Sequence, residues 1–161
     1  MFSRPITPIA LIASAVVVLD RSSKIWAENS LTPGISKPVI GELLQFHLTY
    51  NPGAAFSIFT NATWFFTLFS TFVVGYIIFK AKMITSKVWQ IGVGGILGGA
   101  IGNLIDRAIN NPGFPNGHVT DFLQLPNWPV FNVADSSVCL SAIFLIILSM
   151  RGINYDGSKD V

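Results

Sequence analysis

The sequence predicts a mainly α-helical membrane protein with four transmembrane helices in a single domain spanning residues 1–161. Of the 161 residues, 51% are hydrophobic and only 11% are charged, and the mean hydropathy is +0.58. A soluble domain of this length cannot bury that much apolar surface. The apolar residues gather into four segments near the ~20 residues that a helix needs to cross ~30 Å of hydrocarbon. These segments span approximately residues 5–26, 60–79, 88–109 and 130–150.

The first two segments need a closer look. The most apolar stretch of the first, Ile9 to Leu19, is short and follows a basic residue, Arg4, a pattern that also describes a secretory signal peptide. No A-x-A cleavage site follows at the expected place, and Asp20, Arg21 and Lys24 continue a helical pattern, which favours a retained helix. The second segment is short unless it begins upstream of Trp64. We therefore place its start near residue 60.

The basic residues near the segment ends predict the orientation, since cytoplasmic loops are enriched in Lys and Arg. They lie in the N-terminus, the loop after the second segment and the C-terminus: Arg4, Lys80, Lys82, Lys87, Arg151 and Lys159. Both termini should then be cytoplasmic, as an even number of spans requires. The loops 28–62 and 110–129 should lie outside, and the second of these contains no Lys or Arg.

With this orientation, the polar residues of the spans fall on the outer side. They are Asp20 and Lys24 in the first segment, Asn51 before the second, Asn103, Asp106 and Arg107 ending the third, and Asn132 and Asp135 opening the fourth. A helix from Asp135 to Met150 rises ~22 Å, which leaves Asp135 about a quarter of the way into a ~30 Å core. A carboxylate at that depth is costly and indicates function. With Asp121 in the preceding loop, the two carboxylates suggest acid/base chemistry.

Several of these residues also have a structural interpretation. Asp20 and Lys24 have the i, i+4 spacing of a helical ion pair, for which a structural role is favoured. Asn132 and Asp135 are three residues apart at a helix start, so either one can cap the helix. Taken alone, Asp135 would be a helix-start acid. Together with Asp121, it is better explained by catalysis.

The third segment leaves one alternative open. Asn103, Asp106 and Arg107 share adjacent helix faces, where the Arg fork can hold either a carboxylate or a peptide carbonyl. Overlapping small-x-x-x-small faces in the same segment favour close helix contacts over a ligand site. They are formed by Gly92, Gly94, Gly95, Gly98, Gly99 and Gly102.

Other chemistries find little support. His47 and His118 are the only histidines, and neither lies in an H-E-x-x-H motif, so no metal site is expected. The single cysteine, Cys139, cannot form an intramolecular disulfide and lies among apolar neighbours, where thiols are usually inert. The net charge of +2 and the dispersed basic residues argue against a nucleic-acid partner.

Five motifs in order give a more specific indication. They are Asp20 to Lys24 (DRSSK), Asn51 to Phe56 (NPGAAF), Gly98 to Arg107 (GGAIGNLIDR), Val119 to Phe122 (VTDF) and Phe131 to Asp135 (FNVAD). In this order the series resembles bacterial lipoprotein signal peptidase, also called signal peptidase II. The match covers most of the chain, from the first apolar segment to the fourth.

The resemblance implies a four-helix integral membrane aspartyl peptidase with a small extracytoplasmic β-rich platform between the first two helices. It implies that Asp121 and Asp135 are the catalytic pair and that Asp20 and Lys24 are structural. The residues it assigns to substrate contact and support are Asn51, Asn103, Asp106, Arg107 and Asn132. Neither a metal nor an organic cofactor is implied.

The implied substrate is a prolipoprotein, whose signal peptide is cut just before a diacylglyceryl-modified cysteine. This reaction would occur at the extracytoplasmic side of the bacterial cytoplasmic (inner) membrane. Surrounding lipid is the other expected partner, and the chain is expected to work as a monomer.

Two other classes remain as alternatives. A transporter or proton-coupled channel needs acidic residues spread toward both membrane faces, whereas the inner halves of the second and fourth segments have none. A non-catalytic assembly factor predicts that substituting both Asp121 and Asp135 leaves function intact.

Overall fold

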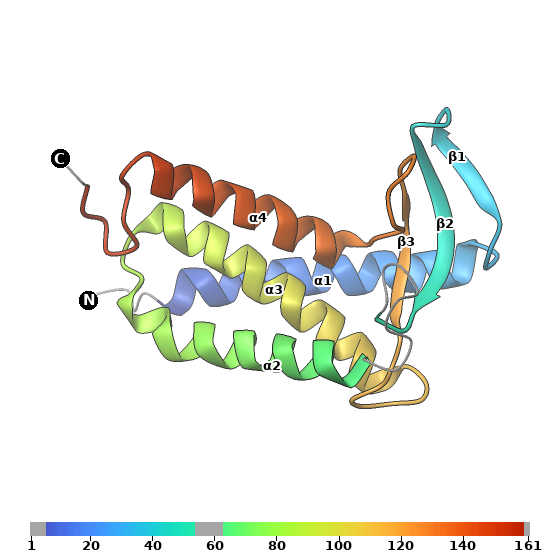
Figure 1. Cartoon of the computed structure of the whole chain (residues 1–161), viewed down its shortest axis with the longest axis horizontal. Coiled ribbons are helices and arrows are strands. Elements are labelled where there is room, and N and C mark those ends of the chain that lie inside the picture. The colour runs from blue at the N-terminus through green and yellow to red at the C-terminus, as the bar shows by residue number, and fades with distance from the viewer. Residues whose placement is uncertain (1–5, 54–62, 160–161) are drawn as a thin grey trace.

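The computed structural model describes residues 6–53 and 63–159, and this part of the chain folds into helices capped by a small sheet (Figure 1). The helices are α1 (Ile6–Ser30), α2 (Thr63–Lys80), the short 3-10 helix η1 (Ala81–Met83), α3 (Lys87–Ile109) and α4 (Val133–Met150). The strands β1 (Ser36–Ile40), β2 (Leu44–Asn51) and β3 (Val119–Gln124) form an antiparallel sheet in the order β1-β2-β3.

Four helices of the described residues are long and apolar enough to cross a membrane, as predicted. The predicted end of the first at Trp26 is too early, because α1 continues to Ser30. Its last turn and the residue after it pack through Ala27 and Leu31 into a core with the sheet. Helix α4 begins at Val133 rather than residue 130. Residues 60–62, where the second span was predicted to begin, lie outside the described residues.

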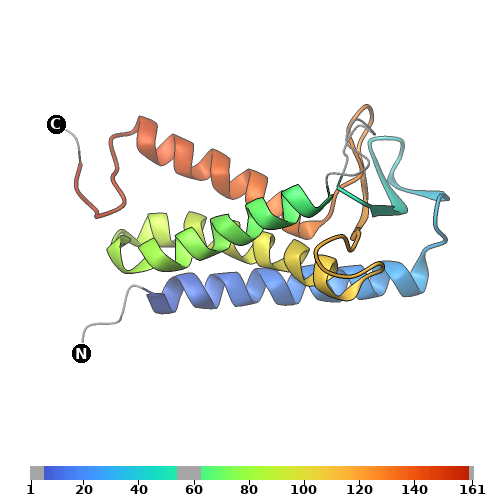
Figure 2. The same cartoon turned by 60° about the horizontal axis from the view of Figure 1, so that its bottom comes forward.

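The four long helices lie side by side, with the sheet at one end of the bundle (Figures 1 and 2). The start of α1 and the end of α4 lie at the opposite end. Helix α3 contacts each of the other three long helices, so it forms the centre of the bundle. Strand β3 comes from the connection between α3 and α4. The sheet therefore joins two loops, not only the loop between the first two helices from which a platform was expected.

The glycines of α3 allow this central position. A Cβ atom on Gly98 would lie 2.7 Å from the carbonyl oxygen of Ala13 in α1. A Cβ atom on Gly99 would lie 2.5 Å from the carbonyl oxygen of Ala134 in α4. Both distances are too short for a real side chain, so the predicted close helix contacts are confirmed.

The sheet is held against the bundle by a small apolar core. Buried Leu48 of β2 and Phe122 of β3 pack with the end of α1. Trp26 meets Phe46 edge to face, with ring centroids 4.9 Å apart. In the register of the sheet, Thr49 of β2 lies opposite Asp121 of β3. The packing therefore fixes β3, and Asp121 with it, against the helices.

Candidate active site

Asp121 and Asp135 come from different elements and are linked by one side chain. Asp121 lies in the middle of β3, and Asp135 lies in the first turn of α4. The Nδ2 atom of Asn132 donates to Oδ1 of Asp121 at 2.7 Å, while its Oδ1 accepts from the backbone N–H of Asp135 at 2.8 Å. The structure thus brings the two carboxylates predicted from sequence to one place.

Asp135 also caps α4. Its Oδ2 accepts from the backbone N–H of Asn132 at 3.2 Å, and together with the reverse bond this forms a capping box. Its other oxygen, Oδ1, accepts from Nδ2 of Asn103 at 2.8 Å. The capping roles considered for Asn132 and Asp135 are therefore both realised. Capping also fixes the carboxylate of Asp135 in one orientation.

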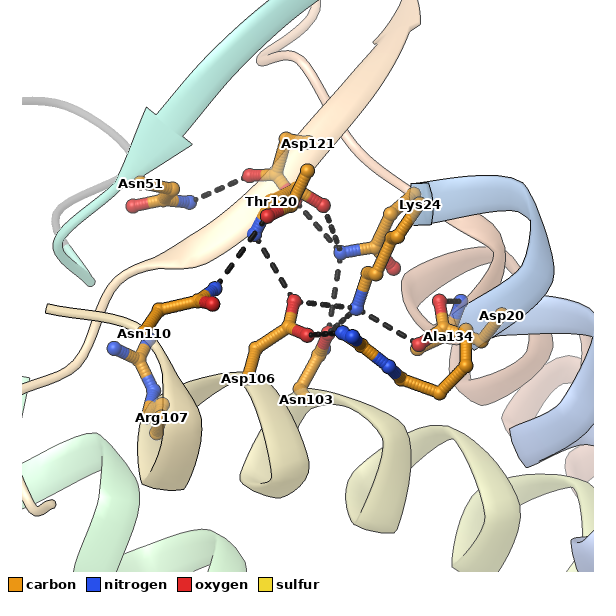
Figure 3. A network of polar contacts seen from close by, with 12 residues as sticks. Asp20, Lys24, Asn51, Asn103, Asp106, Arg107, Asn110, Thr120, Asp121 and Ala134 are labelled. Atoms are coloured by element: carbon orange, nitrogen blue, oxygen red, sulfur yellow. Dashed lines mark hydrogen bonds and ion pairs between the residues drawn. The ribbon is translucent and has the colours of Figure 1, made fainter. Parts of the chain in front are cut away.

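Asp121 is almost fully buried, with 1% of its surface exposed. It accepts hydrogen bonds from the amide of Asn51, at 2.9 Å (Figure 3), and from the amide of Asn132. Burial first, and then the negative charge of Asp135, raise the pKa of Asp121 to about 7, although the hydrogen bonds from the two amides act to lower it. The carboxyl group of Asp121 therefore keeps its proton up to nearly neutral pH.

A network of buried charges lies close to Asp121 (Figure 3). The ammonium of Lys24 lies 2.8 Å from Oδ2 of Asp20 and 2.8 Å from Oδ2 of Asp106, and all three side chains are fully buried. Lys24 also donates to Oδ1 of Asn103 at 3.0 Å. Arg21 lies 2.5 Å from the other oxygen of Asp106. The predicted ion pair of Asp20 and Lys24 is confirmed, and it extends from α1 to α3.

Two carboxylates of this network hold the backbone next to the catalytic candidates. Oδ2 of Asp106 accepts from the backbone N–H of Thr120 at 3.0 Å, one residue before Asp121. Oδ1 of Asp20 accepts from the backbone N–H of Ala134 at 2.9 Å, one residue before Asp135. The network therefore ties both catalytic candidates to α1 and α3.

Arg107 contacts a peptide carbonyl, one of the two alternatives open from sequence. Its Nη1 atom donates to the carbonyl oxygen of Gly117 at 2.8 Å. The nearby acids Asp106, Asp121 and Asp135 all lie within electrostatic range of its guanidinium. The ion pairs of Asp106 are made by Arg21 and Lys24 instead. Arg107 thus adds positive charge beside the carboxylate pair.

Arg21 and Thr120 belong to the site but were not predicted from sequence to be site residues. Arg21 lies inside the DRSSK motif, and its spacing from Asp106 gives no sign of their contact. Thr120 contributes its backbone N–H to Asp106, and its Oγ1 donates to Glu28 at 2.8 Å. Any residue except proline has a backbone N–H, so the identity of residue 120 could not predict this contact.

A cleft of about 190 Å³ borders Asp121. Its walls come from the end of β2, from β3 and from the loop before α4: Thr49, Tyr50, Asn51, Pro52, Asp121, Pro129 and Val130. Both histidines make other contacts. Nδ1 of His47 lies 2.8 Å from Oγ of Ser36, and the ring of His118 packs edge to face against that of Tyr50. Within residues 6–53 and 63–159, no group of three or more His, Cys, Asp or Glu residues has a geometry suited to a metal ion.

The membrane-spanning bundle and its pair of linked carboxylates have the features of an aspartic peptidase that works within a membrane. The model of the family described as signal peptidase (SPase) II matches residues 12–151. The chain therefore belongs to the signal peptidase II family of aspartic peptidases, as the five sequence motifs predicted.

Relatives and solved structures agree with this family. The chain is 46% identical over 145 residues to the lipoprotein signal peptidase of Mycobacterium avium (strain 104), covering 90% of this chain and 80% of the relative. It is 42% identical to that of Rhodococcus jostii (strain RHA1), covering 92% of this chain and 75% of the relative. A solved bacterial membrane enzyme shares the fold with a TM-score of 0.78 and 27% identity, covering 95% of this chain and 93% of that one. A second gives a TM-score of 0.77 and 28% identity over 89% of this chain and 92% of that one.

Proposed function

We propose that this chain removes the signal peptides of diacylglyceryl-modified prolipoproteins, with Asp121 and Asp135 as its catalytic pair. The observation that carries the proposal is the linkage of both carboxylates through Asn132. The raised pKa of Asp121 supports it. The similarity to lipoprotein signal peptidases supports the substrate class.

The charges around the pair favour a single shared proton. Four carboxylates, from Asp20, Asp106, Asp121 and Asp135, are gathered with the three basic groups of Arg21, Lys24 and Arg107. One shared proton leaves this group electrically neutral. A neutral group is the favoured state, since unbalanced charge is costly where water is scarce.

In the proposed reaction, the ionised member of the pair takes a proton from a water molecule as its oxygen bonds to the scissile carbonyl carbon. The protonated member gives its proton to the carbonyl oxygen. These two transfers convert the carbonyl group into a tetrahedral intermediate. The roles then reverse. A proton passes to the amide nitrogen, the carbon–nitrogen bond breaks, and the carbonyl is restored as the intermediate returns its proton to the pair.

The surrounding polar residues orient the pair and hold the substrate in this proposal. Asn51 and Asn132 orient Asp121, and Asn103 orients Asp135, through the hydrogen bonds that they donate. We assign Arg107 to binding backbone carbonyl oxygens of the substrate, the interaction that it makes with Gly117 here. An extended substrate needs such donors because lipid offers none.

We further propose that the site faces the extracytoplasmic side of the bacterial inner membrane and that both termini are cytoplasmic. Four basic residues belong to the end of the bundle opposite β3 and the start of α4: Lys80, Lys82, Lys87 and Arg151. Because cytoplasmic loops are enriched in Lys and Arg, they support this orientation. The diacylglyceryl chains would anchor the substrate cysteine in the outer leaflet, near the depth of Asp135. In this proposal the chain acts as a single domain and as a monomer.

The experiment that tests the substrate uses two precursors of identical sequence, one with the diacylglyceryl group on its cysteine and one without. We expect the purified chain to cut the modified precursor immediately before that cysteine, as the product masses would show. The unmodified precursor should be cut at least about tenfold more slowly, because it lacks the chains that anchor it in the membrane. Equal cutting of both precursors, or a cut elsewhere, would contradict the proposed specificity.

A further inference from the structure

A second pocket lies at the end of the bundle away from the carboxylates, between the end of α2 and the start of α3. Its volume is about 300 Å³. Its lining includes three aromatic residues, one lysine and one buried valine: Tyr76, Trp89, Tyr155, Lys80 and Val93. None of these residues takes part in the proposed peptidase chemistry.

The pocket is apolar at depth and cationic at its mouth. Tyr76 precedes Lys80 by one turn of α2, and Val93 follows Trp89 by one turn of α3. Tyr76 and Val93 therefore lie deeper in the bundle than Lys80 and Trp89. Such a gradient suits a ligand with an apolar chain and a polar head, as found where membrane meets water.

The C-terminal segment forms a fixed wall of this pocket. The carbonyl oxygen of Tyr155 accepts hydrogen bonds from the backbone N–H groups of Thr85, at 3.1 Å, and Ser86, at 3.0 Å. Nε1 of Trp89 donates to the carbonyl oxygen of Ile153 at 2.7 Å, and its ring meets that of Tyr155 edge to face. The aromatic walls are thus formed before any ligand arrives.

The charge at this end favours an anion. Lys80, Lys82 and Lys87 lie within eight residues of one another, and among the described residues none of them takes part in an ion pair. The Nζ atom of Lys80 lies 5.5 Å from the centre of the Phe79 ring. The amino end of α3 opens beside the pocket, and its N-cap, Ser86, makes no side-chain capping bond. A helix start adds positive potential for a phosphate group.

We propose that this pocket binds an anionic phospholipid of the surrounding membrane. One acyl chain lies along Tyr76 and Val93, and the phosphate lies beside Lys80. The occupant must be apolar where it enters the bundle and negative at the mouth, and an anionic membrane lipid meets both conditions. The site is independent of the peptidase reaction, because Asp121 and Asp135 belong to β3 and the first turn of α4, at the other end of the bundle.

The test titrates the full-length chain in detergent with phosphatidylglycerol, or with phosphatidylcholine of the same acyl chains, and counts bound lipid by native mass spectrometry. We expect wild type to bind phosphatidylglycerol more tightly. Lys80→Gln should weaken that binding about fivefold, the effect of ~1 kcal/mol for one basic residue, and should leave phosphatidylcholine binding unchanged.

Lys82→Gln is the matched control. It removes the same charge two residues away, from a side chain that does not line the pocket. We expect it to change phosphatidylglycerol binding by less than about twofold. Equal binding of the two lipids to wild type would overturn the proposal. So would equal losses in Lys80→Gln and Lys82→Gln, since diffuse attraction to the membrane surface would then explain the binding.

Discussion

Replacing Asp121 or Asp135 with asparagine is expected to slow signal-peptide cleavage by about 10²- to 10⁴-fold. Asparagine keeps the shape of aspartate but can neither take a proton from water nor give one to the carbonyl oxygen. The double variant should be about as slow as either single variant, because residues that act as a unit have non-additive effects. Initial rates on a diacylglyceryl-modified precursor in detergent measure all three.

Asp156→Asn is the matched control for this experiment. Asp156 is an exposed acid in the C-terminal segment, where its carboxylate accepts from the N–H and hydroxyl of Ser158. It lies outside the site, so its substitution should leave the rate unchanged. Folded Asp121→Asn and Asp135→Asn variants that cut at the wild-type rate would show that the aspartates are structural.

The free energy of unfolding should depend on pH differently in wild type and in Asp121→Asn, and its measurement also shows whether the inactive variant is folded. The pKa of Asp121 rises from 3.8 to about 7 on folding, mainly through burial. The folded chain therefore binds more protons than the unfolded chain between these values, and wild-type stability should fall as pH rises from about 4 to about 7. Asp121→Asn should lack this contribution. Its stability should therefore improve relative to wild type over that range and then keep a constant difference above it.

Replacing Lys24 with methionine is expected to reduce the free energy of unfolding by about 3–5 kcal/mol, the cost of breaking a buried ion pair. Methionine fills similar space but leaves Asp20 without its ion-pair partner and Asp106 with Arg21 alone. Unfolding in detergent, followed by circular dichroism, measures the change.

The comparison variant is Lys37→Met, on the exposed strand β1. Among the described residues, Lys37 donates a single hydrogen bond, to the carbonyl oxygen of Ser30 at the surface, so its loss should change stability by less than about 0.5 kcal/mol. Folded Lys24→Met should also cut more slowly, because Asp20 and Asp106 hold the backbone beside the proposed catalytic pair. Equal stability of the two variants would mean that the buried network contributes little.

The helices were predictable because a helix that crosses lipid must be apolar over most of its length. Their ends were less so. The predicted end at Trp26 follows the decline in hydropathy, but α1 continues to Ser30 as Ala27 and Leu31 pack against the sheet. Hydropathy predicts which residues contact lipid, but it does not predict this contact between a helix end and the sheet. The start of α4 at Val133 depends on the cap formed by Asn132, whose spacing from Asp135 was visible in the sequence.

The site was predictable where side chains carry the chemistry. Asp121, Asp135 and Asn132 stand in recognisable motifs, and the structure brings them together. Strand β3 was not predicted, since a short strand between two helices is defined by pairing with the distant strand β2. The partner of Arg107 also stayed open in the sequence, because a guanidinium can donate to either a carboxylate or a carbonyl.

The claim that Asp121 and Asp135 share a proton is tested most directly by infrared spectroscopy of the carboxyl C=O stretch during a pH titration. In wild type we expect a protonated-carboxyl band that disappears near pH 7. The band should be absent in Asp121→Asn. In Asp135→Asn it should disappear at lower pH, because the charge of Asp135 is one cause of the raised pKa. A wild-type band that disappears near pH 4, as for an ordinary aspartate, would contradict the shared proton.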